Sequence, residues 1–129
     1  MKIVKINREL KRSMGKIVGN YRYDDKFTAP DTTTKTFVGP EVIRGKILEI
    51  TSGAVADYTT ANKILVLGYR DAGGDDHYVV VEQGSAIKSA QLRGRLFLLP
   101  TEKPIALVVS PTASDALYCS FHGIVYEAE

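Results

Sequence analysis

The stretch from residue 71 to 77 holds the densest group of side chains that could do chemistry. Four of them lie within seven residues around a Gly-Gly pair: Asp71, Asp75, Asp76 and His77. Carboxylates bind hard cations, and an imidazole can bind a metal or carry a proton near neutral pH. The stretch is therefore a candidate ion-binding loop or active site.

The spacing does not match a known calcium loop. An EF-hand needs oxygen ligands at positions 1, 3 and 5, glycine at position 6 and a bidentate glutamate at position 12. Counted from Asp71, position 3 is Gly73 and position 6 is Asp76. The same residues suit a tight reversal, in which the two glycines supply positive φ angles and Asp71 caps the turn with its carboxylate. We predict a structural hairpin here.

Other catalytic or metal-binding patterns are missing from the sequence. His122 stands alone, no Cys or His spacing supplies a zinc site, and no nucleophile or phosphate-binding motif occurs. The single cysteine, Cys119, is expected to be a small buried hydrophobe. We expect no enzyme activity, no cofactor and no metal. A small sandwich enzyme that uses the 71–77 cluster remains the alternative from the enzyme class.

The elements that must position these residues are strands. Apolar residues recur with a period of two, between turns rich in Gly, Pro, Asp and Ser, over 43–51, 63–70, 77–83, 92–99, 105–110 and 116–127. Shorter strands are expected at 16–20, 21–27 and 34–38. No connection after residue 40 offers the helical crossover that a parallel sheet needs. The pattern predicts an all-β protein, an antiparallel β-sandwich of jelly-roll-like type.

Two kinds of strand face can be distinguished. In the last strand, Leu117, Cys119, Phe121, Gly123 and Val125 should face the core, because they alternate with a more polar set. By contrast, the stretches at 95–100 and 105–109 are apolar on both faces. Such strands are either central in a sheet or covered on the outside by a partner subunit.

The charge distribution points to an N-terminal arm. The chain of 129 residues has a formal charge of only +2, but residues 1–22 carry seven basic groups against one acidic group, a net charge of +6. We predict a basic arm with short strands over residues 1–40 and a sandwich domain over 41–129. The basic side chains of the arm would lie on an acidic neighbour: Lys2, Lys5, Arg8, Lys11 and Arg12.

A second basic spot is predicted in the stretch QLRGRLFLLP. Arg93 and Arg95 are two residues apart and would share one face of a strand. They are candidates for contact with an acidic partner surface. Ordinary solvent-facing charges at the start of a strand are the alternative.

The chain from about residue 42 onward resembles small β-sandwich proteins of tailed bacteriophage particles. The resemblance is carried by the ILVLGYRDAGG…HYVVV hairpin, the GRLFLLPTEKPIALVV pair and the closing HGIVYE strand. It implies a non-enzymatic, oligomeric protein that acts as capsid decoration (cement) or as a small head or tail component. The resemblance does not assign a role to any particular residue.

The resulting expectation is a virion structural protein, made in the host cytoplasm, that adheres by surface complementarity. Its partners would be copies of itself, in a trimer or another small ring, and the major capsid protein or another virion protein. No membrane and no specific nucleic acid are expected as partners. A carbohydrate- or receptor-binding module, with its site on tyrosines and loops at one end of the sandwich, is the alternative.

Overall fold

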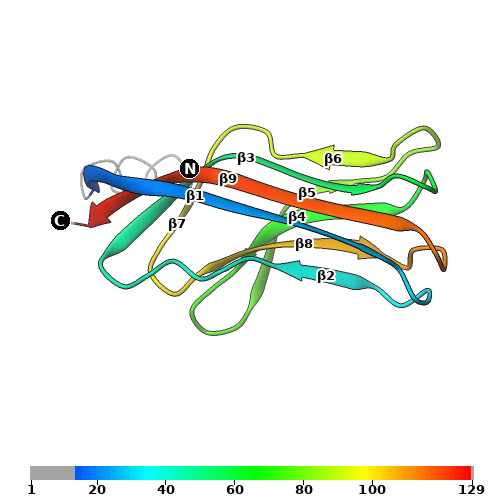
Figure 1. The fold of residues 1–129 in the computed structure, drawn as a ribbon, viewed down its shortest axis with the longest axis horizontal. Coiled ribbons are helices and arrows are strands. Elements are labelled where there is room, and N and C mark those ends of the chain that lie inside the picture. The colour runs from blue at the N-terminus through cyan, green and yellow to red at the C-terminus, as the bar shows by residue number, and fades with distance from the viewer. Residues whose placement is uncertain (1–13, 129) are drawn as a thin grey trace.

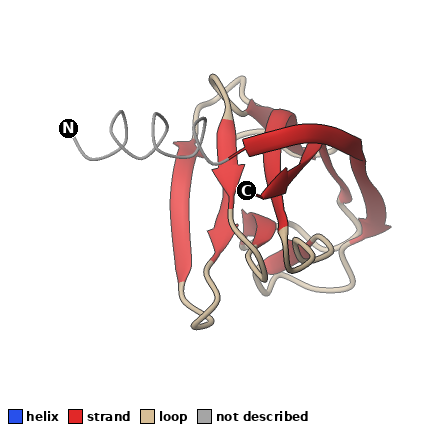
Figure 2. Cartoon of the chain, turned by 90° about the vertical axis from the view of Figure 1, so that its left-hand side faces the viewer, coloured by secondary structure: helices blue, strands red, loops and turns tan. Residues whose placement is uncertain are grey.

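The computed structural model describes residues 14–128, which form two antiparallel sheets packed face to face (Figure 1). All regular elements in this part of the chain are strands (Figure 2). They are β1 (Met14–Thr28), β2 (Lys35–Val38), β3 (Lys46–Asp57), β4 (Ile64–Arg70), β5 (Asp76–Glu82), β6 (Ser89–Gln91), β7 (Leu96–Leu98), β8 (Lys103–Val109) and β9 (Ala116–Ala128). The prediction of an antiparallel β-sandwich is confirmed.

The order of the strands defines the two layers. The five-stranded sheet runs β1-β9-β3-β6, with β7 also paired to β3, and the four-stranded sheet runs β2-β8-β4-β5. Among residues 14–128 no strand pairs with the outer edge of β1 or of β5. Within the described part of the chain, no helix is long and apolar enough to cross a membrane.

The segment before residue 40 is built into both sheets from Met14 onward. β1 pairs with β9 along almost its whole length, from Met14 opposite Ala128 to Thr28 opposite Ala116 (Figure 1). β2 pairs with β8 in the other sheet. The strand pairing therefore shows no boundary at residue 40, where the sequence suggested a division between arm and sandwich. Instead of two short strands over 16–27, there is one strand of 15 residues.

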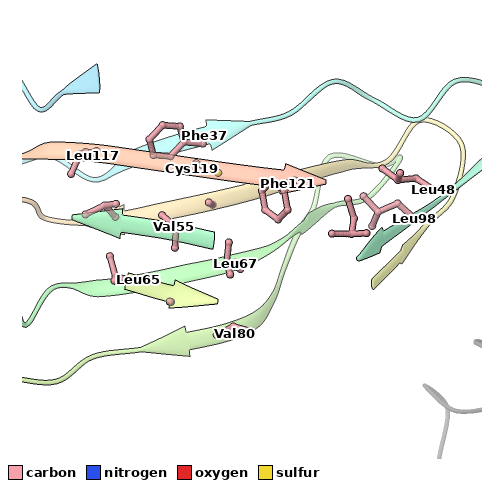
Figure 3. Close-up of a cluster of buried hydrophobic side chains, with 14 of the residues drawn as sticks. Phe37, Leu48, Val55, Leu65, Leu67, Val80, Leu98, Leu117, Cys119 and Phe121 are labelled. Carbon is pink, nitrogen blue, oxygen red and sulfur yellow. The ribbon is translucent and has the colours of Figure 1, made fainter. Parts of the chain in front are cut away.

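The core lies between the sheets. Phe121 and Leu117 of one sheet lie against Phe37, Leu65 and Leu67 of the other (Figure 3). The face predicted for the last strand is confirmed, since Leu117, Cys119 and Phe121 are all buried. Burial raises the pKa of the Cys119 thiol, so that it stays protonated, as expected of a structural cysteine.

Two strand boundaries differ from the prediction. Ser52 and Gly53 look like the start of a turn, but β3 continues through them to Asp57 after a shift in register between Ile50 and Ser52. A bulge accommodates the irregular residues without ending the strand. The expected strand 92–99 shrinks to the three residues of β7, because Gly94 adopts a φ of +83° that interrupts an extended run.

Candidate functional site

The 71–77 cluster is a hairpin between β4 and β5, as predicted. The Asp71 carboxylate accepts hydrogen bonds from the backbone amides of Gly73 at 2.9 Å and Asp75 at 3.0 Å. Its second oxygen lies 2.7 Å from Nε2 of His77, and this contact, with the amides, lowers the pKa of Asp71. Of the two glycines only Gly74 has a positive φ, +90°. These side chains are engaged in holding the turn.

The described residues offer no obvious metal centre. In residues 14–128, no three His, Cys, Asp or Glu side chains are placed so that they could hold one ion. Arg70 pairs with Asp76 at 2.7 Å, which takes up another carboxylate of the hairpin.

The two arginines proposed as a basic spot both pair within the chain. Arg95 Nη1 lies 2.6 Å from Glu49 Oε2, and Arg93 pairs with Glu82. Glu49 is buried and also accepts a hydrogen bond from the Tyr126 hydroxyl at 2.9 Å. Both arginines lie in the connection between β6 and β7, outside regular strands. Their role as partner contacts stays a prediction.

The basic arm residues Lys2, Lys5, Arg8, Lys11 and Arg12 lie outside the described residues. Two of the seven basic groups near the N-terminus are described. Lys16 belongs to β1, and so does Arg22, whose Nε lies 2.6 Å from Asp24 Oδ2. Arg22 therefore takes part in a side-chain network on the sandwich itself.

The outer surface of the four-stranded sheet is apolar in all four strands. Strand register places eight side chains on the side away from the core, and we call them the outer apolar face: Val38, Ile64, Val66, Tyr78, Val81, Ile105, Leu107 and Val109. One row crosses the sheet from the polar Thr36 on β2 through the apolar Leu107 and Val66 to Val81. This explains why the 105–109 stretch is apolar on both faces: β8 is central, and its outer side belongs to this face.

The outer apolar face is buried at its centre and exposed toward its edges. Val66 and Ile105 are buried although they are not part of the core between the sheets. Toward the free edge, Tyr78 is 56% exposed and Val81 is 59% exposed. Large apolar side chains gathered on one exposed surface mark interaction sites.

The outer surface of the five-stranded sheet carries a polar group where the edge strand β1 pairs with β9. At the centre of this group is Asp24 on β1, whose carboxylate receives the Arg22 guanidinium at 2.6 Å, His122 Nε2 at 3.1 Å and the Tyr118 hydroxyl at 3.3 Å. The hydrogen bonds from Arg22 and His122 lower the pKa of Asp24, so its carboxylate is ionised at neutral pH. We call this group, with Lys26 and Tyr58, the polar face.

The polar face contains two adjoining hollows. One, of about 320 Å³, is lined by residues that include Lys26, Tyr58 and Tyr118. The other, of about 410 Å³, is lined by Arg22, Asp24, Asp25, Lys26 and Tyr118. Lys26 and Tyr118 border both.

Sequence reasoning missed the polar face. A signal was available in the stretch NYRYDDK, where Asn20, Arg22, Asp24 and Lys26 occur at every second position and so share one side of a strand. The partners His122 and Tyr118 could not be assigned, because they depend on the pairing of β1 with β9.

Comparisons with known proteins give similarity in fold only. No family model and no curated protein matches the chain. Among solved structures, the Drosophila NLP core, described with pentamer formation and histone binding, has 13% identity and a TM-score of 0.44, covering 81% of this chain and 97% of its own. The xylan-binding domain CBM22-1 of Paenibacillus barcinonensis Xyn10C has 17% identity and a TM-score of 0.41, covering 91% of each chain. The virus-like particle of the extra small virus of the giant freshwater prawn Macrobrachium rosenbergii has 15% identity and a TM-score of 0.39, and the match covers 89% of this chain and 84% of the other.

Proposed function

We propose that this chain is a non-enzymatic structural protein that assembles with copies of itself through the outer apolar face and serves in a viral particle. The particle would be that of a bacteriophage, with the chain acting as decoration protein or as a small head or tail component. The observation that carries the proposal is the outer apolar face, since a sheet that is apolar on both sides is suited to being covered on both sides. The major capsid protein or another virion protein would be the second partner.

A second copy suits the outer apolar face better than a charged partner. The charged row that borders it contains Asp76, Arg70 and Lys103, and in it Arg70 and Asp76 form an ion pair within the chain. Identical surfaces can therefore meet about a twofold axis with little like-charge repulsion from this pair. The adjacent outer edge of β5 has no strand partner among residues 14–128, so its backbone groups can pair with another chain.

Burial of the exposed apolar side chains would stabilise such a contact. Full burial of a Val or Leu side chain contributes about 1.5–3 kcal/mol, so the exposed halves of Val81 and Tyr78 contribute roughly 1 kcal/mol each per copy. Val79, also exposed, sits at a register irregularity of β5. A bulge on an edge strand restricts which partners can pair with it, which favours one defined contact over open-ended aggregation.

The mass of the protein in solution tests this assembly. Val81→Lys places a charge at the exposed β5 edge of the outer apolar face and should shift the mass, measured by light scattering after gel filtration, to that of the monomer. The matched control is Val18→Lys, which makes the same change at an exposed position of β1 in the other sheet. A monomeric wild-type protein, or equal effects of the two substitutions, would contradict the proposal.

The virion role needs its own measurement. Particles of the encoding virus, purified and analysed by mass spectrometry, should contain the chain in many copies. Particles that lack the chain would contradict the virion role, while the result for Val81→Lys would still decide self-assembly.

A further inference from the structure

We propose that the polar face of the five-stranded sheet is a binding site for a neutral oligosaccharide. The site would use Tyr58 and Tyr118 as stacking surfaces and Asp24 and Lys26 as hydrogen-bonding groups. It lies on the opposite side of the sandwich from the outer apolar face, so both can be occupied at once. The proposal does not depend on the assembly described above.

The two tyrosines provide an apolar platform with polar margins. Their ring centroids are 6.0 Å apart and their planes are inclined by 36°. Tyr58 is 58% exposed, although it is a large apolar side chain. A sugar ring presents a face of C–H bonds that packs on an aromatic ring, while its hydroxyls reach out to polar neighbours. An exposed Tyr58 next to a partly buried Tyr118, with fixed polar groups beside them, suits such a ligand.

The polar groups beside the platform are held in place. The Asp24 carboxylate is fixed by Arg22, His122 and Tyr118 at 2.6 to 3.3 Å, and the contacts with Arg22 and His122 lower its pKa. A carboxylate accepts hydrogen bonds from sugar hydroxyls, and charge-assisted bonds of this kind are stronger than neutral ones. Within residues 14–128 the Lys26 ammonium forms no ion pair. It can therefore donate to ring or hydroxyl oxygens of the ligand.

The shape of the polar face favours more than one sugar unit. The two hollows of about 320 and 410 Å³ lie on either side of Lys26 and Tyr118, which border both. Pockets for small molecules begin at about 300 Å³. Each hollow has room for one sugar ring, and the shared residues would contact both rings or the linkage between them. The ligand is thus a disaccharide or a segment of a longer chain.

The charge of the site favours a neutral ligand. Arg22 and Lys26 carry two positive charges, and Asp24 and Asp25 carry two negative charges around the larger hollow. A sulfated or uronic-acid glycan would meet the two carboxylates, and an acidic peptide would meet them as well. An uncharged glycan can form hydrogen bonds with both the positive and the negative side chains and is repelled by neither.

Binding to defined oligosaccharides tests the proposal. The full-length protein would be screened by saturation-transfer NMR against neutral gluco-, xylo-, manno- and galacto-oligosaccharides, with sulfated and uronic-acid oligosaccharides and an acidic peptide as comparison probes. We expect binding to at least one neutral oligosaccharide and stronger binding to a trisaccharide than to the matching monosaccharide. No binding to any neutral probe, or binding to charged probes alone, would overturn the proposal.

The same tyrosine-to-alanine change at two positions locates the site. Tyr58→Ala should weaken binding at least tenfold, whereas Tyr78→Ala, at a tyrosine of nearly equal exposure on the opposite side of the sandwich, should leave it unchanged. Asp24→Asn should also weaken binding. If Tyr58→Ala lowers the melting temperature, Tyr58→Leu keeps a bulky apolar side chain and removes the aromatic face, with the same tenfold loss expected. Equal effects at Tyr58 and Tyr78 would contradict the location.

Discussion

Asp57 and Asp115 are two carboxyl groups buried side by side at one end of the sandwich. Asp57 Oδ1 accepts hydrogen bonds from the amides of Thr59 at 3.1 Å and Thr60 at 3.0 Å, while Oδ2 is buried without a hydrogen-bond partner among the described residues. Burial, together with the neighbouring Asp115 carboxyl, raises the pKa of Asp57 to about 6. Burial alone would raise the pKa of Asp115 too, but the neighbouring Asp57 and hydrogen bonds from the Thr60 hydroxyl and the Thr112 amide lower it. The pair therefore holds one proton, on Asp57, below about pH 6.

This shared proton predicts that stability falls as pH rises. Because the pKa of Asp57 is higher in the folded than in the unfolded chain, its contribution is fully present below about pH 4 and is lost as pH rises through 6. Asp57→Asn supplies a permanent N–H donor to Asp115. We expect the variant to lack this fall and to be more stable than the wild type at pH 8, by about 2 kcal/mol, in urea unfolding at pH 4 to 8.

The reciprocal substitution is the control. Asp115→Asn removes the carboxylate that accepts from the Thr60 hydroxyl at 2.7 Å and from the Thr112 amide at 2.9 Å. It should destabilise the protein at pH 8, where Asp57→Asn stabilises it. If both variants lost stability at pH 8, the shared proton would be the wrong explanation.

At the scale of elements, the contact between β9 and β3 depends on a glycine. A Cβ placed on Gly123 would lie 2.2 Å from the Glu49 carbonyl oxygen, a backbone atom that cannot turn away. Gly123→Ala should therefore lower the free energy of unfolding by about 3 kcal/mol, a value at the upper end for overpacking. Gly19→Ala is the matched control, because nothing lies within 4 Å of its Cβ position in β1. Similar unfolding midpoints for the two variants in urea would refute the close approach.

Elements were predicted from the sequence where local pattern and tertiary packing agree. The alternation from Leu117 to Val125 follows from a two-residue period, and the hairpin at Asp71 follows from turn chemistry, so both were predicted correctly. Ser52 and Gly53 were wrongly predicted to begin a turn, because bulges and turns use the same residue types. Only the pairing with a neighbouring strand decides between the two. The polar face was missed because Asp24 and His122 are 98 residues apart and meet only through strand register.

At the scale of the whole molecule, the outer surfaces of the two sheets differ in chemical character. The four-stranded sheet shows apolar side chains such as Val81, and the five-stranded sheet shows the network around Asp24. The described ends of the chain, Met14 and Ala128, pair with each other at one end of the five-stranded sheet (Figure 1). Assembly through one surface would leave the other free, and any contact made by residues 1–13 would begin at the end where β1 starts.

The last prediction concerns the basic arm and where to cut it. Deleting residues 1–22 would remove Met14–Arg22 from β1, whose partners on β9 reach from Ala128 to His122, and so would expose the edge of β9. Deleting residues 1–13 spares this pairing and still removes five basic groups, with a net charge of +4. We expect that shorter deletion to keep the melting temperature and the self-association of the wild type. It should lose the part of particle binding that weakens with salt, because screening acts on exposed charges.

A charge-neutral variant separates the arm's charge from its length. Replacing Lys2, Lys5, Arg8, Lys11 and Arg12 with Gln should reproduce the deletion in co-sedimentation with particles at low and high salt. Full particle binding by both variants would contradict a role for the arm. The deletion and Val81→Lys change different surfaces of the chain. If the deletion variant lost self-association while Val81→Lys kept it, the assembly contact would lie on the arm and not on the outer apolar face.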